Sequence, residues 1–266
     1  MKGDHLVKMN LVQNIVVIGG QDSNPSKLKT KLEPIKLSQD MGLAVTSFSY
    51  GELLNIYEGN NKIYIKIVQE KEINDESGSI TDEDIHILEI PTGRYKTSLL
   101  VIREIEIVIE NHVHFKGSRS LITIRLISKN NKVNISTSGV DLLVTQKNDT
   151  PWSLLGLSKD IKNNSEVELE NRNLFSGIET AFLYVNIVEN SYINGRLSRN
   201  LCVLPLYYNE GCHFYEFKNP TYAPVEVKEF SDVILEIRNM RGDLVAFNST
   251  GATIISLHLK PINRID

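Results

Sequence analysis

Two groups of residues have the types and spacing that metal binding requires. His112 and His114 are two positions apart, so on a strand they share a face and can hold a metal ion, but no third ligand is evident nearby. An acidic cluster can bind a hard cation such as Ca²⁺, although it lacks the ordered D-x-[DN]-x-[DN]-G spacing. We therefore predict a surface histidine pair, a solvated acidic loop and no metal site. The acidic cluster comprises Asp75, Glu76, Asp82, Glu83 and Asp84.

Other catalytic signatures are absent from the sequence. The apolar run 15–20 ends in Gly19–Gly20, which resembles the entry to a dinucleotide fold, but residues 21–25 contain Asp, Ser, Asn and Pro and cannot continue as the required helix. There is no G-x-S-x-G, and neither cysteine lies in a recognisable His-partnered motif. His213 and His258 lie in strand-like segments and are expected to pack. We predict no catalytic residue, no cofactor and no enzyme activity.

The composition indicates a globular protein. Of 266 residues, 41% are apolar and 23% are charged, so a sizeable core is feasible. The net charge is −4 and the basic residues are scattered, which argues against sequence-specific nucleic-acid binding. No secretory leader and no run of 18 apolar residues is present, so we expect no membrane association and synthesis in the cytosol. For Cys202 and Cys212 we favour reduced thiols, but the sequence leaves their pairing open.

The elements that must position these residues are mostly short strands. Alternating or β-branched segments recur with turn signals between them, which predicts an all-β sandwich or barrel. The segment 97–114 is ambiguous, and we favour a helix that begins near Ser98, which can cap it. Residues 151–157 predict a short helix that buries Trp152, and Arg241–Gly242–Asp243 predicts a turn. The expected strands are 14–20, 43–50, 62–69, 84–90, 121–127, 132–136, 142–146, 180–188, 201–207, 233–237 and 252–259.

Aromatic residues are densest near the C-terminal end. Along a strand, alternation sends about half of them into the core and leaves the other half for a contact surface. The stretch comprises Tyr207, Tyr208, Phe214, Tyr215, Phe217 and Tyr222. From this stretch we take Tyr207, Tyr208 and Tyr222 as candidate interface residues, and from elsewhere in the chain Tyr57.

Several stretches follow one known pattern. Leu32, Pro34, Ile35 and Leu37 fit a short motif before a strand, residues 91–95 fit P-x-G-x-Y, and residues 215–225 fit Y-E-F-x-x-P-x-Y-x-P-V. In this order the chain resembles the penton, or minor capsid, protein of Polinton/Maverick elements and related virophages. It departs from the family at residues 41–43, where Trp is frequent, and at residues 258–260.

The resemblance implies a fold and a function. The expected fold is a single jelly-roll domain over residues 1–266, with an inserted or elaborated, helix-containing region around 70–120. The implied function is a structural virion protein, made in the host cell cytoplasm, that forms homopentamers at the five-fold vertices of an icosahedral capsid. Its expected partners are itself and a double jelly-roll major capsid protein.

Two other functions remain open at this stage. A carbohydrate- or receptor-binding β-sandwich module would expose Tyr and Trp on loops, whereas Trp152, the only tryptophan, lies in an apolar turn. A polysaccharide-cleaving enzyme would place two carboxyl groups about 5–9.5 Å apart in a groove, and no pair can be chosen among 33 acidic residues without geometry.

Overall fold

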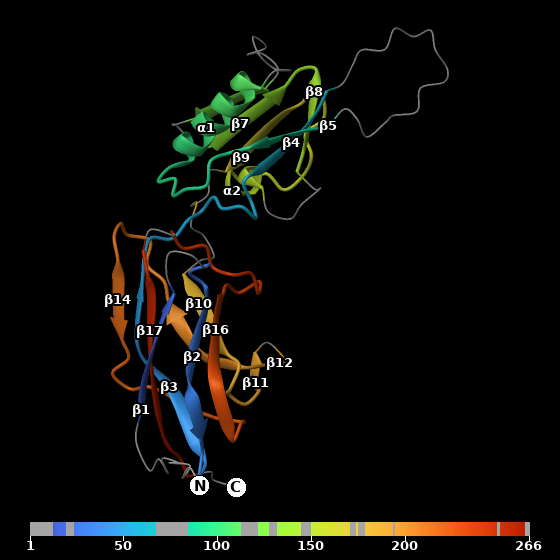
Figure 1. Ribbon diagram of the computed structural model, residues 1–266. Coiled ribbons are helices and arrows are strands. Elements are labelled where there is room, and N and C mark those ends of the chain that lie inside the picture. The colour runs from blue at the N-terminus through green and yellow to red at the C-terminus, as the bar shows by residue number, and fades with distance from the viewer. Residues whose placement is uncertain are drawn as a thin grey trace. The chain divides into compact units, whose positions relative to one another are not determined.

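The chain divides into two compact units. Unit 1 comprises Met1–Leu53 and Gly177–Asp266, and unit 2 comprises Leu54–Ser176, inserted between them in sequence (Figure 1). The structure, a computed structural model, describes residues 13–19, 24–67, 85–112, 122–127, 132–144, 150–170, 174, 179–193, 195–248 and 251–263. Whether the two units together act as the single domain expected from the sequence stays a prediction.

Unit 1 consists of two antiparallel sheets. Sheet A has the order β1-β17-β3-β14, with the short β15 also paired to β3, and sheet B has the order β13-β10-β16-β2. A separate two-stranded hairpin, β11-β12, lies between β10 and β13 in the chain. The strands are β1 (Gln13–Gly19), β2 (Lys27–Lys36), β3 (Met41–Tyr50), β10 (Thr180–Val185), β11 (Ser191–Ile193), β12 (Arg196–Ser198), β13 (Asn200–Pro205), β14 (His213–Glu216), β15 (Ala223–Pro224), β16 (Glu229–Arg238) and β17 (Thr253–Pro261).

The pairing of these strands is that of a jelly roll. The first strand pairs with the last (β1 with β17), the second with the second last (β2 with β16), and the third with β14. The two strands in the middle of unit 1, β10 and β13, pair with each other. A long antiparallel ribbon that folds over itself gives this nesting and splits into two four-stranded sheets. The prediction of an all-β jelly-roll β-sandwich is confirmed.

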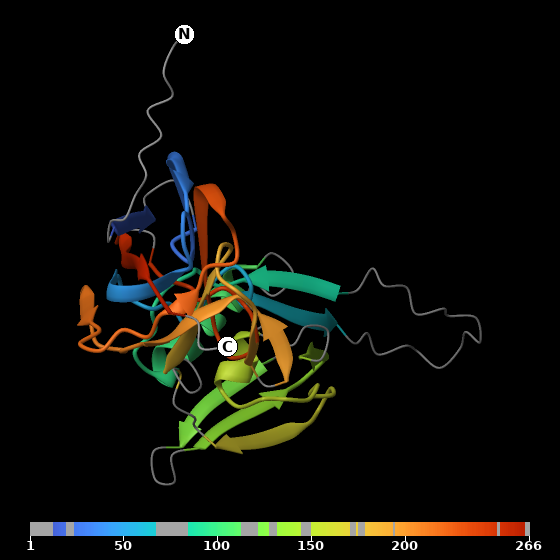
Figure 2. The ribbon, with the colours of Figure 1, turned by 90° about the horizontal axis from the view of Figure 1, so that it is seen from below.

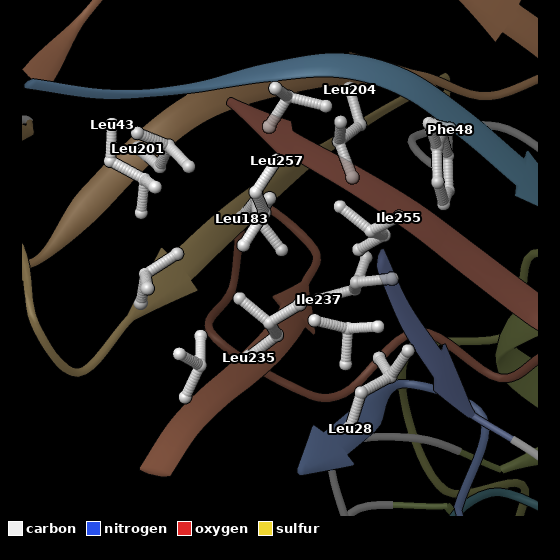
Figure 3. Packing of buried hydrophobic residues seen from close by; sticks show 14 of the residues in the cluster. Leu28, Leu43, Phe48, Leu183, Leu201, Leu204, Leu235, Ile237, Ile255 and Leu257 are labelled. Atoms are coloured by element: carbon white, nitrogen blue, oxygen red, sulfur yellow. The ribbon is translucent and has the colours of Figure 1, made fainter. Parts of the chain in front are cut away.

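The two sheets bury one face each against the other. Alternation along β17 sends Ile255, Leu257 and Leu259 inward, and alternation along β16 sends Val233, Leu235 and Ile237 toward them. Figure 3 shows side chains of both sheets meeting in this core, with Leu183 and Leu204 from β10 and β13 and Phe48 from β3. Each such side chain contributes about 1.5–3 kcal/mol when it is fully buried, so burial of this core stabilises unit 1.

Unit 2 contains both helices of the described residues. The helix α1 (Ser98–Asn111) starts where the sequence predicted, although its N-cap is Thr97, whose side chain accepts a hydrogen bond from the backbone N–H of Leu100. The short helix α2 (Pro151–Leu154) buries Trp152 completely, as predicted. The strands form two three-stranded sheets, β5-β4-β8 and β6-β7-β9. They are β4 (Lys62–Ile67), β5 (Ile85–Glu89), β6 (Ile122–Ile127), β7 (Lys132–Thr137), β8 (Val140–Leu143) and β9 (Glu166–Glu170).

Buried asparagines shape the first loop of unit 2. The Asn55 side chain exchanges two hydrogen bonds of 2.8 Å with the backbone of Tyr95, and Asn60 Nδ2 donates to the carbonyl of Asn55. Asn60 Oδ1 accepts from the backbone N–H of Tyr57 at 2.7 Å. Because buried amides replace the backbone partners that a loop lacks, these residues fix the turn before β4 that the sequence indicated at Asn60.

The sequence missed several strands. The strand β2 alternates lysine with apolar residues and contains Pro34, a residue that argues against a central strand but is tolerated at a sheet edge, where β2 lies. The strand β9 is short and mostly charged, and the hairpin β11-β12 has only three residues a strand. Periodicity over so few residues carries little information.

Candidate assembly surfaces

Exposed large apolar side chains of unit 1 gather at two opposite edges of the sandwich. The strands β1 and β2 are each the outermost strand of their sheet, and they contact each other at one edge of the sandwich. The strands β13 and β14 are the outermost strands at the other end of each sheet. We call these the β1 edge and the β13–β14 edge; Figure 2, seen from below, shows the dark-blue β1 and the orange β14 at different ends of sheet A.

The β1 edge presents a short apolar row. Alternation along β1 buries Ile15 and Val17 and leaves Val16 and Ile18 exposed, with 61% of Ile18 accessible to solvent. The cross-strand partner of Ile18 on β17, Ile254, is partly exposed and extends the row. No charged residue occurs in β1. An uncharged, apolar strand at a sheet edge is a site where other chains pack or pair, unless it is protected.

The β13–β14 edge carries the larger apolar set. Phe214 on β14 is 69% exposed, and Val203 on β13 and Tyr207 just after it are also exposed. Separately from this edge, the hairpin β11-β12 exposes Tyr192 and Leu197, which face each other across the two strands. Isolated two-stranded hairpins are marginally stable in water, so this one gains from contact with another surface. Among the described residues of unit 1, the only other exposed large apolar side chain is Met240, in the turn after β16.

Register places the two edges at the same height. Ile18 pairs with Ile254, Ile254 with Ser49, and Ser49 with Phe214. These four residues therefore form one transverse row across sheet A, with Ile18 and Phe214 at its two ends. The middle of the row is small or partly exposed, so the apolar surface is concentrated at the ends.

Charge is distributed unevenly between the edges. The strand β2 has four lysines and one glutamate, whereas residues 206–217 at the other edge have two glutamates, Glu210 and Glu216, and no lysine or arginine. Three β2 lysines already form exposed ion pairs with β16 carboxylates, of which Lys27–Glu236 is one at 3.2 Å. The paired carboxylates offset most of the lysine charge, so the β1 edge is close to neutral whereas the β13–β14 edge is acidic.

Two of the predicted interface tyrosines lie at the β13–β14 edge. Tyr207 is exposed, and its backbone N–H donates to the buried hydroxyl of Tyr50 at 2.6 Å, which fixes where β13 ends. Tyr208 is partly buried and packs against the core. Burial raises the pKa of its hydroxyl to about 12, and the nearby Glu179 carboxylate adds to the shift. Tyr207 therefore has the accessible side chain of the two.

The other two predicted tyrosines lie elsewhere. Tyr222 is partly buried against the outer face of sheet A, where its hydroxyl lies 2.5 Å from Nδ1 of His258 and Lys260 Nζ lies 3.8 Å from the ring centroid. Tyr57 belongs to unit 2, in the asparagine-held loop. The role of all four as interface residues stays a prediction. The sequence did not single out Val16, Ile18 or Val203, because alternation alone does not reveal which strands lie at an edge.

The residues considered for chemistry do not assemble into a site among the residues that the structure describes. The ring of His112 lies edge-on to that of His86, 5.4 Å between centroids, while His114 and the acidic cluster 75–84 lie outside the described residues. No group of three potential metal ligands occurs in the described part of the chain. Cys202 and Cys212 are both free thiols, the first partly buried and the second exposed. No helix within the described ranges is long and apolar enough to cross a membrane.

Known proteins are similar to this chain in structure but not in sequence. No protein-family model matches the chain, and no curated protein matches it. Among solved structures, the chain is similar to the crystal structure of the selenomethionine-labelled mavirus penton protein, with 11% sequence identity over 94% of this chain and 100% of that chain, at a TM-score of 0.42. The similarity agrees with the resemblance noted in the sequence.

Proposed function

We propose that this protein is a structural capsid protein of the penton type, which forms homopentamers at the five-fold vertices of an icosahedral shell. The observation that carries the proposal is the segregation of exposed apolar side chains to two different edges of a jelly roll. The sequence pattern of the penton family supports it independently.

Two different edges favour a ring over a two-fold dimer. A two-fold contact buries the same patch on both copies, whereas a ring joins one patch of each copy to a different patch of the next. Here the β1 edge and the β13–β14 edge differ in their exposed side chains and in their charge. In a closed ring, head-to-tail contacts cover both edges of every copy, whereas an open chain of copies leaves one edge uncovered at each end.

The remaining parts of the proposal follow from a vertex position. A pentamer in a shell is surrounded by the major capsid protein, here a double jelly-roll protein, and the chain acts within the virion after synthesis in the host cell cytoplasm. The work is assembly, so no catalytic group is required. The alternative of a carbohydrate- or receptor-binding module loses its best candidate platform, because Trp152 is buried completely.

The experiment is a mass measurement of the purified full chain. Native mass spectrometry and mass photometry between nanomolar and ten micromolar concentration should show a species of five copies, about 150 kDa given a chain of 30.1 kDa. A strict monomer at ten micromolar, unchanged when the major capsid protein is added, would contradict the proposal. A discrete dimer would favour a two-fold contact instead.

A further inference from the structure

We infer that, in the ring, the β1 edge of one copy packs against the β13–β14 edge of the next copy. This inference rests on the proposed function and adds which surfaces meet. The occupant of the β1 edge is thus a second copy of this chain, and the side chains that meet are Val16 and Ile18 on one copy and Phe214 on the other, all on the outer face of sheet A.

The transverse row supports this pairing. Ile18 and Phe214 lie at the same height along the strands, at opposite ends of sheet A. When copies stand side by side around an axis that runs along the strands, residues at one height stay at one height. Ile18 of one copy therefore lies at the height of Phe214 of its neighbour, and no shift along the axis is needed for the two to meet.

Charge disfavours one alternative pairing. Glu210 and Glu216 flank Phe214 in the chain, so contact between two β13–β14 edges would bring like charges together. The β1 edge brings no such repulsion, because three of the four lysines of β2 are ion-paired with carboxylates of β16.

The exposed thiol of Cys212 provides a test, since it lies two residues from Phe214. We would introduce Ile18→Cys in the full chain, treat the ring with a short bismaleimide, and resolve the products on a denaturing gel. The expected result is a ladder of covalent oligomers up to the pentamer. The ladder should disappear in Ile18→Cys combined with Cys212→Ser, because each copy then has its accessible thiol only at the β1 edge.

Two controls make the outcome decisive. Met240→Cys adds a thiol that is exposed to a similar degree as Ile18 but lies in the turn after β16, outside β1 and β14, and should give no ladder. Mass photometry on each variant before cross-linking shows whether the ring is present. A pentamer that cross-links in the Cys212→Ser background, or that gives no ladder with Ile18→Cys, overturns the inference and leaves the proposed function standing. A chain that stays monomeric in the absence of substitutions overturns both.

Discussion

Truncation of Phe214 tests the proposed contact quantitatively. Full burial of a phenylalanine side chain contributes about 2.5 kcal/mol, and 69% of Phe214 remains exposed in unit 1, so Phe214→Ala should remove about 1.7 kcal/mol from each contact between copies. A pentameric ring has five such contacts, and the concentration at half-assembly varies with the fourth root of the assembly constant. The midpoint should therefore rise about 35-fold, at about 1.4 kcal/mol for each tenfold change.

The assay is a dilution series followed by mass photometry, with unfolding in urea measured in parallel. The free energy of unfolding of unit 1 should change by less than about 0.5 kcal/mol, because Phe214 is a surface side chain on a short edge strand. Met240→Ala is the matched control: Met240 is 64% exposed but lies in the turn after β16, outside β1 and β14, and its truncation should leave the midpoint unchanged. A shift below threefold for Phe214→Ala, or an equal shift for Met240→Ala, would refute the reasoning.

Three further predictions concern the stability of unit 1. Asn186→Ala should lower the free energy of unfolding, measured in urea, by about 1–3 kcal/mol. Asn186 Oδ1 accepts from the backbone N–H of Ile234 at 2.8 Å, and its Nδ2 donates to the carbonyl of Asp232. An unchanged free energy of unfolding would contradict this role. Tyr50→Phe should also lower the free energy of unfolding by about 1–2 kcal/mol, because the backbone N–H of Tyr207 loses its acceptor. The phenylalanine ring can still stack on Phe48, so the change isolates the loss of the hydroxyl. Burial raises the pKa of the Cys202 thiol from 9.0 to about 12, so the folded chain keeps a proton that the unfolded chain releases. The stability that this proton contributes is complete below about pH 8.5 and is lost as the pH rises toward 12. The urea midpoint of the unsubstituted chain should therefore fall more steeply with pH than that of Cys202→Ala between about pH 9 and 11. Parallel curves would contradict this prediction.

Much of the fold followed from local patterns. The β-branched alternation of residues 253–261 and 229–238 marks strands with one buried face, and the structure places Ile255, Leu257 and Leu235 in the core accordingly. The turn at residues 239–243 was also readable, because Gly242 adopts a φ of +92°, which glycine accepts without strain. The helix at Ser98 was less clear, since residues 103–110 alternate as a strand does; its burial pattern of Val101, Ile102, Ile105 and Ile109 shows that the helical period prevailed.

The candidate site was less predictable. The sequence singled out tyrosines because aromatic residues are common at interfaces, and the structure leaves Tyr207 exposed but holds Tyr208 partly against the core. It gave no reason to select Ile18, because an exposed isoleucine on a central strand and one on an edge strand look alike in a sequence. Phe214 was part of the aromatic stretch, yet its exposure depends on β14 being the last strand of sheet A.

The sequence by itself determined which residues prefer strands, which side of each strand is apolar, and the absence of recognisable catalytic motifs, because these depend on neighbours a few positions apart. Only the tertiary structure decided which strands lie side by side and which lie at an edge. The row from Ile18 through Ile254 and Ser49 to Phe214 joins positions separated by about two hundred residues, through backbone hydrogen bonds that any sequence can make. Because those bonds carry no side-chain signature, the surfaces by which copies of this chain can meet become visible only after the chain has folded.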